Sequence, residues 1–365
     1  MTLSLYIARR FVLTFLMVLG VFYALLFMVD MIEQMRRHAD SAIGLAQASE
    51  LSLLNVPASL YRILPLVTIL ASVGLFVALA RSSELVVMRA AGRSALRTLT
   101  APVTAALVVG GLAVAALNPV VAATSKRYEA LSESYRSGGG SVLSVSREGL
   151  WLRQGDSSGQ TVIHAARANQ DGTHLDEVSF LFFGPGGTPD RRIEAQSAVL
   201  APGQWRLTDA KVWQFGPGVN AEQTATAEPA MAVPSDLTVD RIRNSFGEPS
   251  AIAIWDLPAF IADLERAGFS ARKHLVWLQM ELAMPLLLAA MVLVGAGFTM
   301  RHARFGRTGL MVLLAMASGF AIFFLRNFAQ VLGENGQIPV LLAAWSPPVA
   351  ATLLALSLLL HLEDG

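Results

Sequence analysis

Hydrophobic residues dominate six long stretches of the chain, three before and three after a more polar middle. The hydrocarbon core of a bilayer is about 30 Å thick, and an α-helix needs about 20 residues to cross it. A helix pairs its own backbone groups, which lipid cannot do. The pattern therefore predicts an α-helical membrane protein with six transmembrane helices, at residues 11–29, 63–80, 99–117, 275–299, 308–332 and 338–360. The first stretch is longer than a typical signal-peptide core, so we expect it to remain in the protein.

Between the third and fourth stretches, the pattern changes from a helical to an alternating period. Val178, Phe180 and Phe182 point to one side of an extended strand, and the residues between them point to the other. Clusters of glycine and proline separate several such runs. These features predict an inserted all-β domain of the sandwich or jellyroll type. Its inner face, near Phe180 and Val199, is expected to form either an apolar groove or an ordinary packed core.

An amphipathic pattern at 255–267 predicts a further helix between the β domain and the fourth stretch. The chain thus divides into three parts. The three parts are residues 1–118, with three transmembrane helices and a short helix at 83–91; residues 119–274, with the β domain and its helical connectors; and residues 275–365, with the last three transmembrane helices.

Arginines gather in alternate loops, which sets the orientation of the helices. The loops after the second and fourth stretches carry Arg81, Arg89, Arg93, Arg97, Arg301, Arg304 and Arg307, with Glu84 as the acidic residue among them. The loop at 30–55 carries more acidic than basic residues. Because basic loops stay in the cytoplasm, we expect cytoplasmic termini and a β domain on the outer side of the membrane.

Composition removes several classes of function. Of the 365 residues, 54% are hydrophobic and 15% are charged, and the net charge of +1 implies no attraction to nucleic acid. There is no cysteine, so thiolate chemistry and disulfides are excluded. No Walker A, HExxH or GxSxG motif occurs, and no metal-ligand spacing is present. We therefore expect a non-catalytic protein without a cofactor or a metal.

The loop between the second and third stretches contains a short helical pattern. A serine precedes Glu84, which suits the positive end of a helix, and Gly92 can end that helix in the left-handed conformation. One interpretation is a helix lying among lipid headgroups. The other is a protrusion that inserts into a groove of a cytoplasmic partner, with Leu85 and Met88 as apolar anchors and Glu84 paired with a partner cation.

The segment from Ser83 to Gly92, Ser-Glu-Leu-Val-Val-Met-Arg-Ala-Ala-Gly, resembles the coupling helix of the LptF/LptG family of permeases. The segments Gly-Gly-Ser-Val-Leu at 139–143 and Glu-Gly-Leu-Trp at 148–151 are similar to the start of the outer domain in the LptG branch. The connector at 255–270, with its Ala-Gly step, is also similar. The resemblance covers the whole chain in order: three spans, a β domain and three spans.

This resemblance implies a permease subunit of the ABC transporter that extracts lipopolysaccharide from the bacterial inner membrane. The implied partners are an LptF-like sister permease, two copies of an LptB-like ATPase and an LptC-like membrane-anchored jellyroll protein. The β domain would be a periplasmic jellyroll that passes the lipid to a bridge of similar domains. The ATPase would contact Ser83, Glu84, Leu85, Met88, Arg89 and Gly92.

The resemblance also places lipid gates on the first and fifth spans, where Phe22, Leu26, Phe323 and Phe324 are the candidate wall residues. Lipid-facing packing is the alternative for each of them. Binding of a phosphorylated headgroup requires cations, and the candidates are Arg36, Arg37, Arg62, Arg127, Arg136 and Arg326. Arg326 lies inside a span, where it either reaches the interface or pairs with Glu281. Some relatives carry a basic residue where this chain has Asp30.

Two other classes of function compete with this interpretation. A membrane-anchored sensor would require a cytoplasmic output domain, and the C-terminal tail after the last stretch is short. A secondary transporter usually has repeated halves and broken spans. The three-plus-three pattern here shows no evident internal repeat.

Overall fold

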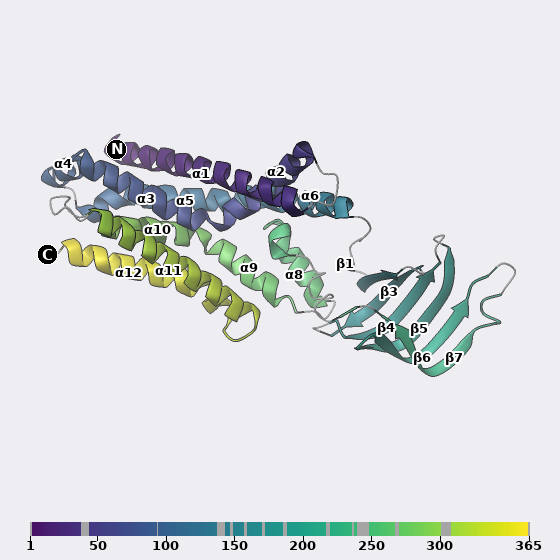
Figure 1. Cartoon of the computed structure of the whole chain (residues 1–365). Helices are drawn as coiled ribbons and strands as arrows, with labels where there is room; N and C mark the ends of the chain where they lie inside the picture. The colour runs from purple at the N-terminus through teal and green to yellow at the C-terminus, as the bar shows by residue number, and fades with distance from the viewer. Residues whose placement is uncertain are drawn as a thin grey trace. The chain divides into compact units, whose positions relative to one another are not determined.

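A computed structural model describes residues 2–37, 44–92, 94–136, 143–146, 149–156, 159–169, 172–184, 188–216, 220–235, 237–238, 248–266, 270–300 and 308–363. The chain forms two compact units, one helical and one mainly of strands (Figure 1). The helical unit comprises Met1–Ser137, Ser250–Trp255 and Arg272–Gly365, and the β unit comprises Gly138–Pro249 and Asp256–Ala271.

The helical unit contains long apolar helices from both ends of the chain. Among the described residues, five segments are long and apolar enough to cross a membrane, and the bent pair α9–α10 brings the number to six if it is one span. The helices of the N-terminal part are α1 (Thr2–Arg37), α2 (Leu45–Arg62), α3 (Leu64–Arg81), α4 (Glu84–Ala90), α5 (Ala95–Leu112) and α6 (Asn118–Arg136). Those of the C-terminal part are α9 (Arg272–Leu282), α10 (Met284–Thr299), α11 (Thr308–Glu334) and α12 (Val340–Glu363).

The loop expected at 30–55 contains helix α2, which the hydrophobicity pattern did not indicate. Its buried residues Ala48, Leu51, Ser52 and Val56 follow helical spacing, and α2 packs on α1 and α6. Its polar outer face lowered the average hydrophobicity of the segment, so an amphipathic helix was read as a loop.

The third span is continuous but irregular. Helices α5 and α6 are joined by a π-helical turn, η1 (Ala113–Leu117), rather than by a loop. Such a turn leaves backbone carbonyls without their usual intrahelical partners and is common at functional sites. Here the indole N–H of Trp255 donates to the carbonyl of Ala115 at 3.1 Å.

The fourth span is broken between α9 and α10, which are bent by 50°. Pro285 begins α10 and has no backbone N–H to continue the hydrogen bonds of α9. Helix α5 packs very closely on this break, because a Cβ atom added to Gly110 would lie 2.5 Å from the Cα of Pro285.

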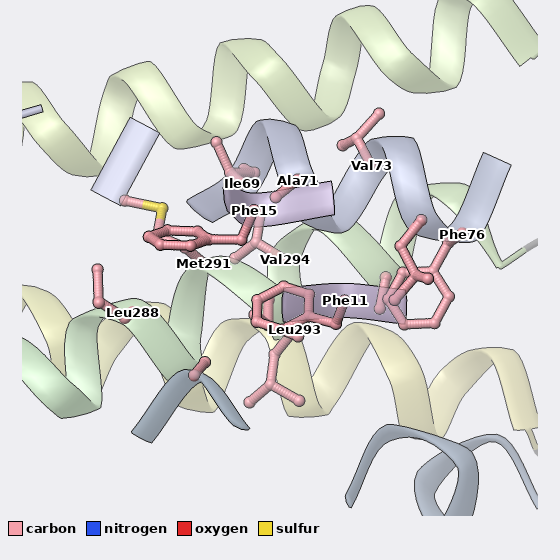
Figure 2. Packing of buried hydrophobic residues seen from close by; sticks show 14 of the residues in the cluster. Phe11, Phe15, Ile69, Ala71, Val73, Phe76, Leu288, Met291, Leu293 and Val294 are labelled. Carbon is pink, nitrogen blue, oxygen red and sulfur yellow. The ribbon is translucent and has the colours of Figure 1, made fainter. Parts of the chain in front are cut away.

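The core of the helical unit lies where α1, α3, α5 and α10 meet (Figure 2). Phe11 and Phe15 of α1 and Phe76 of α3 are buried there with Leu288 and Met291 of α10. Apolar side chains on every side of α10 make it the most enclosed helix, whereas α1 and α11 leave many apolar side chains exposed. This arrangement places α10 inside the helical unit and α1 and α11 at its periphery.

The three C-terminal spans are tied together at one end. The guanidinium of Arg272, at the start of α9, donates to the carbonyls of Gly333 and Ile338, each at 2.6 Å. Gly333 also allows α11 and α12 to pack closely, since an added Cβ would lie 2.5 Å from the Cβ of Ala343.

The β unit contains one antiparallel sheet whose strands pair in the order of the sequence. The strands are β1 (Leu143–Ser146), β2 (Gly149–Asp156), β3 (Gly159–Ala168), β4 (His174–Phe183), β5 (Pro189–Ala201), β6 (Gln204–Gln214) and β7 (Thr226–Pro234). The expected all-β domain is therefore present, but its described strands form a meander. This order corrects the jellyroll prediction, because a jellyroll has two sheets joined by Greek-key crossings.

A crease crosses the sheet and changes which residues face inward. Glu177 of β4 and Asp209 of β6 both have φ of 52°, in the left-handed region. In the four strands β3 to β6, the buried positions on either side of this crease are three residues apart instead of two. The pairs are Ala165 and Ala168, Leu175 and Val178, Ala195 and Ala198, and Leu207 and Ala210.

The crease corrects the prediction for Val199. Strict alternation placed this residue on the same face as Phe180, but its side chain is 41% exposed while Phe180 is fully buried. Phe180 packs edge-on against Trp205, with ring centroids 6.3 Å apart.

The helix predicted at 255–267 is confirmed as α8 (Leu257–Arg266), with Leu257, Ile261 and Leu264 buried on one face. Residues 267–269, which follow α8, lie outside the described residues. A short 3₁₀ helix, η2 (Pro249–Ala251), precedes it.

Candidate functional site

Helix α4 (Glu84–Ala90) occupies the loop between the second and third spans, where a short helix was predicted. Ser83 precedes it with φ of 58°, and Gly92 follows it with φ of 77°, which confirms the predicted left-handed end. Ser94 then caps α5 by accepting a hydrogen bond from the backbone of Arg97 at 3.2 Å. Glycine suits the position after α4 because it has no Cβ to clash in this conformation.

The structure divides the apolar residues of α4 between two environments. Leu85 and Met88, the expected anchors for a partner, are buried in the core of the helical unit, and α4 packs on α3. Val86 and Val87 point outward, with 51% and 67% of their surface exposed. The apolar surface that α4 presents in this chain therefore comes from the two valines. The side chain of Arg89 lies outside the described residues.

Glu84 belongs to a compact polar cluster within the chain, made of Tyr6, Arg10, Ser82 and Glu84. Its Oε1 accepts hydrogen bonds from Arg10 and from Ser82, each at 2.7 Å. Its Oε2 accepts one from the hydroxyl of Tyr6 at 3.1 Å. Arg10 also donates to the Tyr6 hydroxyl at 2.8 Å, which closes the cluster.

This cluster changes the expected role of Glu84. Partial burial by itself raises the pKa of its carboxyl, but the hydrogen bonds from Ser82, Arg10 and Tyr6 outweigh it, and the pKa lies below its ordinary value. Glu84 is therefore an anion with an internal cation beside it. The sequence alone did not predict a contact between Arg10 and Glu84. The spacing of Tyr6 and Arg10, four residues apart on one helix face, was the signal for their contact.

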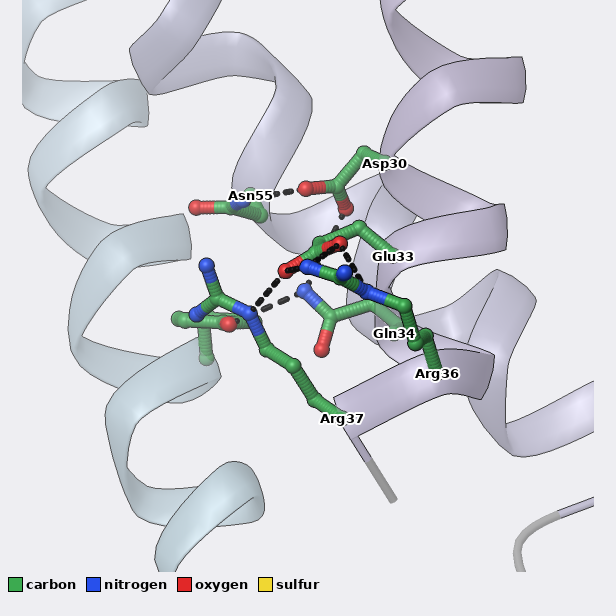
Figure 3. Close-up of polar contacts among 7 residues, drawn as sticks. Asp30, Glu33, Gln34, Arg36, Arg37 and Asn55 are labelled. Atoms are coloured by element: carbon green, nitrogen blue, oxygen red, sulfur yellow. Dashed lines mark hydrogen bonds and ion pairs between the residues drawn. The ribbon is translucent and has the colours of Figure 1, made fainter. Parts of the chain in front are cut away.

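At the other end of α1, the first two candidate headgroup cations share one acidic partner (Figure 3). Arg36 and Arg37 pair with Glu33 at 2.9 Å and 2.7 Å, and both guanidinium groups remain largely exposed. Asp30 is engaged by amides instead, accepting from Asn55 at 2.7 Å and from Gln34 at 3.4 Å. Glu33 and Asp30 balance the charges of the two arginines, but both guanidinium groups remain accessible to solvent at this end.

The remaining candidate cations lie in different environments. Arg62, at the end of α2, and Arg127, on α6, are exposed. Arg136 closes α6, and its side chain lies outside the described residues. Arg326 differs from all of these because only 5% of its surface is exposed. Its guanidinium therefore does not reach the surface, and contact with a headgroup is not available to it in this conformation.

Arg326 belongs to an interior polar cluster with Tyr61, Asn118 and Glu281. The Tyr61 hydroxyl donates to Oε2 of Glu281, and the Asn118 amide donates to the same oxygen at 3.3 Å. Arg326 and Glu281 attract each other electrostatically, as expected, although the described contacts include no ion pair between them. Tyr61 and Asn118 were missed, because polar residues at the ends of apolar stretches carry no distinctive spacing.

The candidate gate residues lie on two helices that both pack on α3. On α1, Phe22 and Leu26 are half-buried, and Phe22 contacts the core. On α11, the rings of Phe323 and Phe324 are 6.1 Å apart, and Phe324 is largely exposed. Each of the two helices thus carries one pair of apolar candidate gate residues, and the described contacts do not connect one pair with the other.

In the β unit, the inner face of the sheet is apolar, and the guanidinium of Arg191 lies at its border. Phe180 is fully buried, whereas Phe182 is half-buried beneath the guanidinium of Arg191, which lies 4.2 Å from the ring centroid. Within the described part of the chain, no group of three or more acidic, histidine or cysteine side chains is arranged to hold a metal ion.

Comparison with known proteins identifies the architecture. The family described as lipopolysaccharide export system permease LptF/LptG matches residues 5–361. The permease protein LptG of Escherichia coli strain K12 is 24% identical over 366 residues, which cover 98% of this chain and 97% of the relative. LptG of Escherichia coli O6:H1 strain CFT073 has the same identity and coverage.

Proposed function

Because the chain belongs to the LptF/LptG family of lipopolysaccharide export permeases, we propose that it is the LptG-like membrane subunit that moves lipopolysaccharide out of the bacterial inner membrane. The observation that carries this proposal is the family match over residues 5–361. It spans both helical halves and the β unit between them. The motor is a separate ATPase, since the sequence contains no nucleotide-binding motif.

The physical difficulty of this task is the transfer of several acyl chains. Each methylene group exposed to water costs about 0.8 kcal/mol, so an aqueous route for a lipid with several chains is prohibitive. The permease must therefore keep the chains against apolar surfaces from the bilayer to the β unit. Exposed apolar side chains of α1 and α11 provide the first surface, including Leu13, Met17, Val21, Leu25, Phe320, Phe324 and Phe328.

The same two helices are the proposed contact surface for an LptF-like sister permease. Both helices lie at the periphery of the helical unit, and both contact α3. A cavity between the two permeases would then have Phe22 and Leu26 on one wall and Phe323 and Phe324 on another. Closing this cavity by a movement of the sister subunit would drive the lipid outward.

The lipid headgroup is expected at the end of α1 that carries Arg36 and Arg37. Guanidinium groups suit phosphate because they donate two parallel hydrogen bonds, and Arg62, Arg127 and Arg136 extend the positive surface. The β unit would be periplasmic and accept the acyl chains on its inner face near the half-buried Phe182, next to the fully buried Phe180. It would deliver them to a bridge that begins with an LptC-like protein.

Helix α4 is the proposed contact with the ATPase. The complex would contain two copies of an LptB-like ATPase, and one of them would bind this chain. Two adjacent exposed valines are suited to a hydrophobic groove, where buried apolar side chains provide most of the binding energy. This assignment requires α4 and both termini to be cytoplasmic, as the distribution of arginines predicts.

The proposal is tested by reconstitution. The chain would be co-expressed with its sister permease and ATPase, and the complex placed in vesicles that contain lipopolysaccharide. We expect ATP to transfer the lipid to a soluble β-domain acceptor, and a non-hydrolysable analogue to transfer none. A flux that needs only an ion gradient and no ATPase would overturn the proposal in favour of a secondary transporter.

Photo-crosslinking provides a residue-level control. A crosslinker at Phe324 should capture lipopolysaccharide from the cavity, and capture should change with ATP. A crosslinker at Leu354, an exposed residue of α12, reports ordinary bilayer contact. Equal ATP dependence at both positions would remove the gate assignment.

A further inference from the structure

Helix α11 packs on the rest of the helical unit through one narrow side, the inner seam. The members of the seam recur at alternating steps of four and three residues, which places them along one side of a helix. Five of them are buried, and the sixth, an isoleucine, packs against the core. They are Ala315, Gly319, Ile322, Arg326, Ala329 and Gly333. Arg326 is therefore a charged residue within a side that otherwise consists of small or apolar residues.

The opposite side of α11 carries three exposed phenylalanines, which form the aromatic row: Phe320, Phe324 and Phe328. Each lies four residues from the next, so the three share one side of the helix. Arg326 is two residues away from both Phe324 and Phe328, which is about 200° around a helix of 3.6 residues per turn. The rotation of α11 about its own axis thus decides whether the aromatic row can face the proposed lipid cavity.

The small residues of the seam select this rotation only weakly. Gly319 allows α11 to approach α3, since an added Cβ would lie 2.7 Å from Cδ1 of Ile69. Lipid tails are as apolar as leucine, however, so no hydrophobic effect drives one apolar side of a membrane helix inward rather than another. A charged side chain differs, because its exposure to lipid is strongly unfavourable. Arg326 is 5% exposed and therefore distinguishes the inner side of α11 from all others.

Glu281 of α9 provides a fixed anion for Arg326. Its Oε2 accepts hydrogen bonds from Tyr61 of α2 and from Asn118 of α6, so two further helices hold the carboxylate in place. Its Oε1 is buried and accepts no hydrogen bond from any residue that the structure describes. The negative charge of Glu281 attracts the guanidinium of Arg326. The carboxylate thus draws the seam side of α11 toward the interior of the helical unit.

We infer that Arg326 is a positioning residue, whose attraction to Glu281 fixes the rotation of α11 and directs the aromatic row to the proposed lipid cavity. The inference rests on the proposed function, because the cavity belongs to that proposal. Arg272 provides a second attachment at the carbonyl of Gly333, seven residues further along the same seam. One attachment would allow α11 to turn about that point, whereas attachments at two levels hold its rotation.

Disulfide crosslinking measures this rotation. A Cβ at residue 319 would lie 3.6 Å from the Cβ of Ile69, which is within the range of disulfide bonds. The chain has no cysteine, so Gly319→Cys with Ile69→Cys creates a unique thiol pair, the seam pair. In the complex with the sister permease and the ATPase, we expect mild oxidation to crosslink the seam pair rapidly. Phe320→Cys with Ile69→Cys should crosslink slowly, because residue 320 lies on the exposed side.

Substitutions at Arg326 then test the cause of the rotation. Arg326→Met should lower the crosslinking rate of the seam pair by about fivefold, at the lower end of typical coupling strengths. Arg326→Lys should keep the fast rate, because the described contacts include no hydrogen bond from the guanidinium to Glu281 and a positive charge is sufficient. Asn327→Met is the matched control. It introduces the same side chain one position away from the seam and should leave the rate unchanged.

The double variant Glu281→Gln with Arg326→Met separates positioning from stability. Replacing both charges of a buried pair by uncharged groups often restores stability, but it does not restore the attraction. We expect most of the melting temperature to be recovered while the crosslinking rate of the seam pair stays about fivefold low. The inference is overturned if the double variant crosslinks as fast as the parent, because the small residues would then set the rotation.

Lipid transfer gives a second measurement, made in the chain without introduced cysteines. The double variant should show lower ATP-driven transfer than the unmodified chain. Full transfer by a double variant whose seam pair crosslinks slowly would also overturn the inference, since the aromatic row would not need to be directed. If the unmodified complex transferred no lipid with ATP, the proposed function would fail instead. Crosslinking would still report the rotation in that case, so the two failures are distinguishable.

Discussion

Asn118 donates a hydrogen bond to Glu281 at 3.3 Å and thereby joins the irregular points of two membrane-spanning segments. Asn118 directly follows the π-helical turn in the third span, and Glu281 lies just before the break in the fourth. The side-chain Oδ1 of Asn118 also accepts a hydrogen bond from the backbone N–H of Ile254 at 2.9 Å. One buried amide thus holds two spans and the Ser250–Trp255 segment together.

Removal of the charge on Glu281 is expected to destabilise the helical unit. Glu281→Gln preserves the shape of the side chain but leaves Arg326 buried without a nearby anion. Removing one member of a buried charged pair typically costs about 3–5 kcal/mol. Thermal unfolding in detergent would measure the loss, and the double variant Glu281→Gln with Arg326→Met should recover much of it. Equal stability of the unmodified and Glu281→Gln chains would mean that the two charges do not interact.

Substitution of Gly110 tests the close packing of α5 on the broken span. In Gly110→Ala, the new methyl group would lie 2.5 Å from the Cα of Pro285, and overpacking of this kind costs about 1–3 kcal/mol. Gly111→Ala is the control, because an added Cβ there meets nothing within 4 Å. The control should be neutral or slightly stabilising, since alanine favours helix. The difference in melting temperature between the two variants measures the effect.

Changes on α4 should separate binding from folding. Val87→Asp is expected to weaken co-purification of the ATPase by about tenfold, the size of a moderate interface contact, without changing the melting temperature. Leu85→Asp would place a carboxylate in the core and lower the stability of the chain itself. Val199→Asp makes the same chemical change on the β unit and should affect neither measurement. Undiminished ATPase yield with Val87→Asp would remove α4 from the interface.

The contact between Glu84 of α4 and Arg10 of α1 is expected to depend on pH. The folded-state pKa of Glu84 lies below its ordinary value of 4.5, so the charged form is favoured by folding. The contribution of the pair is fully present above pH 4.5 and is lost as the pH falls through the lowered folded-state pKa. A fluorescence distance between probes on α1 and α4 should therefore increase in that acidic range. Glu84→Gln should give a distance that does not respond.

The two faces of the sheet make opposite predictions for lipid contact. A photo-crosslinker at Phe182, on the inner face beside Arg191, should capture lipopolysaccharide during ATP-driven transfer. The same crosslinker at Val199 should capture little, because the crease places Val199 on the other face. Stronger labelling at Val199 would place the lipid path on the outer face of the sheet.

The sequence was most informative where one property extends over many residues. Long apolar stretches predicted the spans because the bilayer imposes a fixed length on them. Gly92 was correctly placed because few residues adopt its backbone conformation. Alternation located the strands of the β unit, but Glu177 and Asp209 interrupted it at positions where the residue type gives no warning, and Val199 was therefore assigned to the wrong face.

The contacts of the site were harder to predict because they depend on how the helices pack. Leu85, Val86, Val87 and Met88 are chemically alike, and only the position of α3 decides which of them are buried. The contact between Arg10 and Glu84 joins residues 74 positions apart. The Arg326–Glu281 interaction was anticipated, because two charges at similar depth in an apolar environment have few alternatives.

The two hydrogen bonds of Arg272 restrict how a gate on α11 could open. They attach the end of α11, through Gly333, and the start of α12, through Ile338, to the first turn of α9. Helix α11 therefore cannot move at this end independently of α9 and α12. Opening of the gate at α11 would require the last three spans to rotate together as one rigid body.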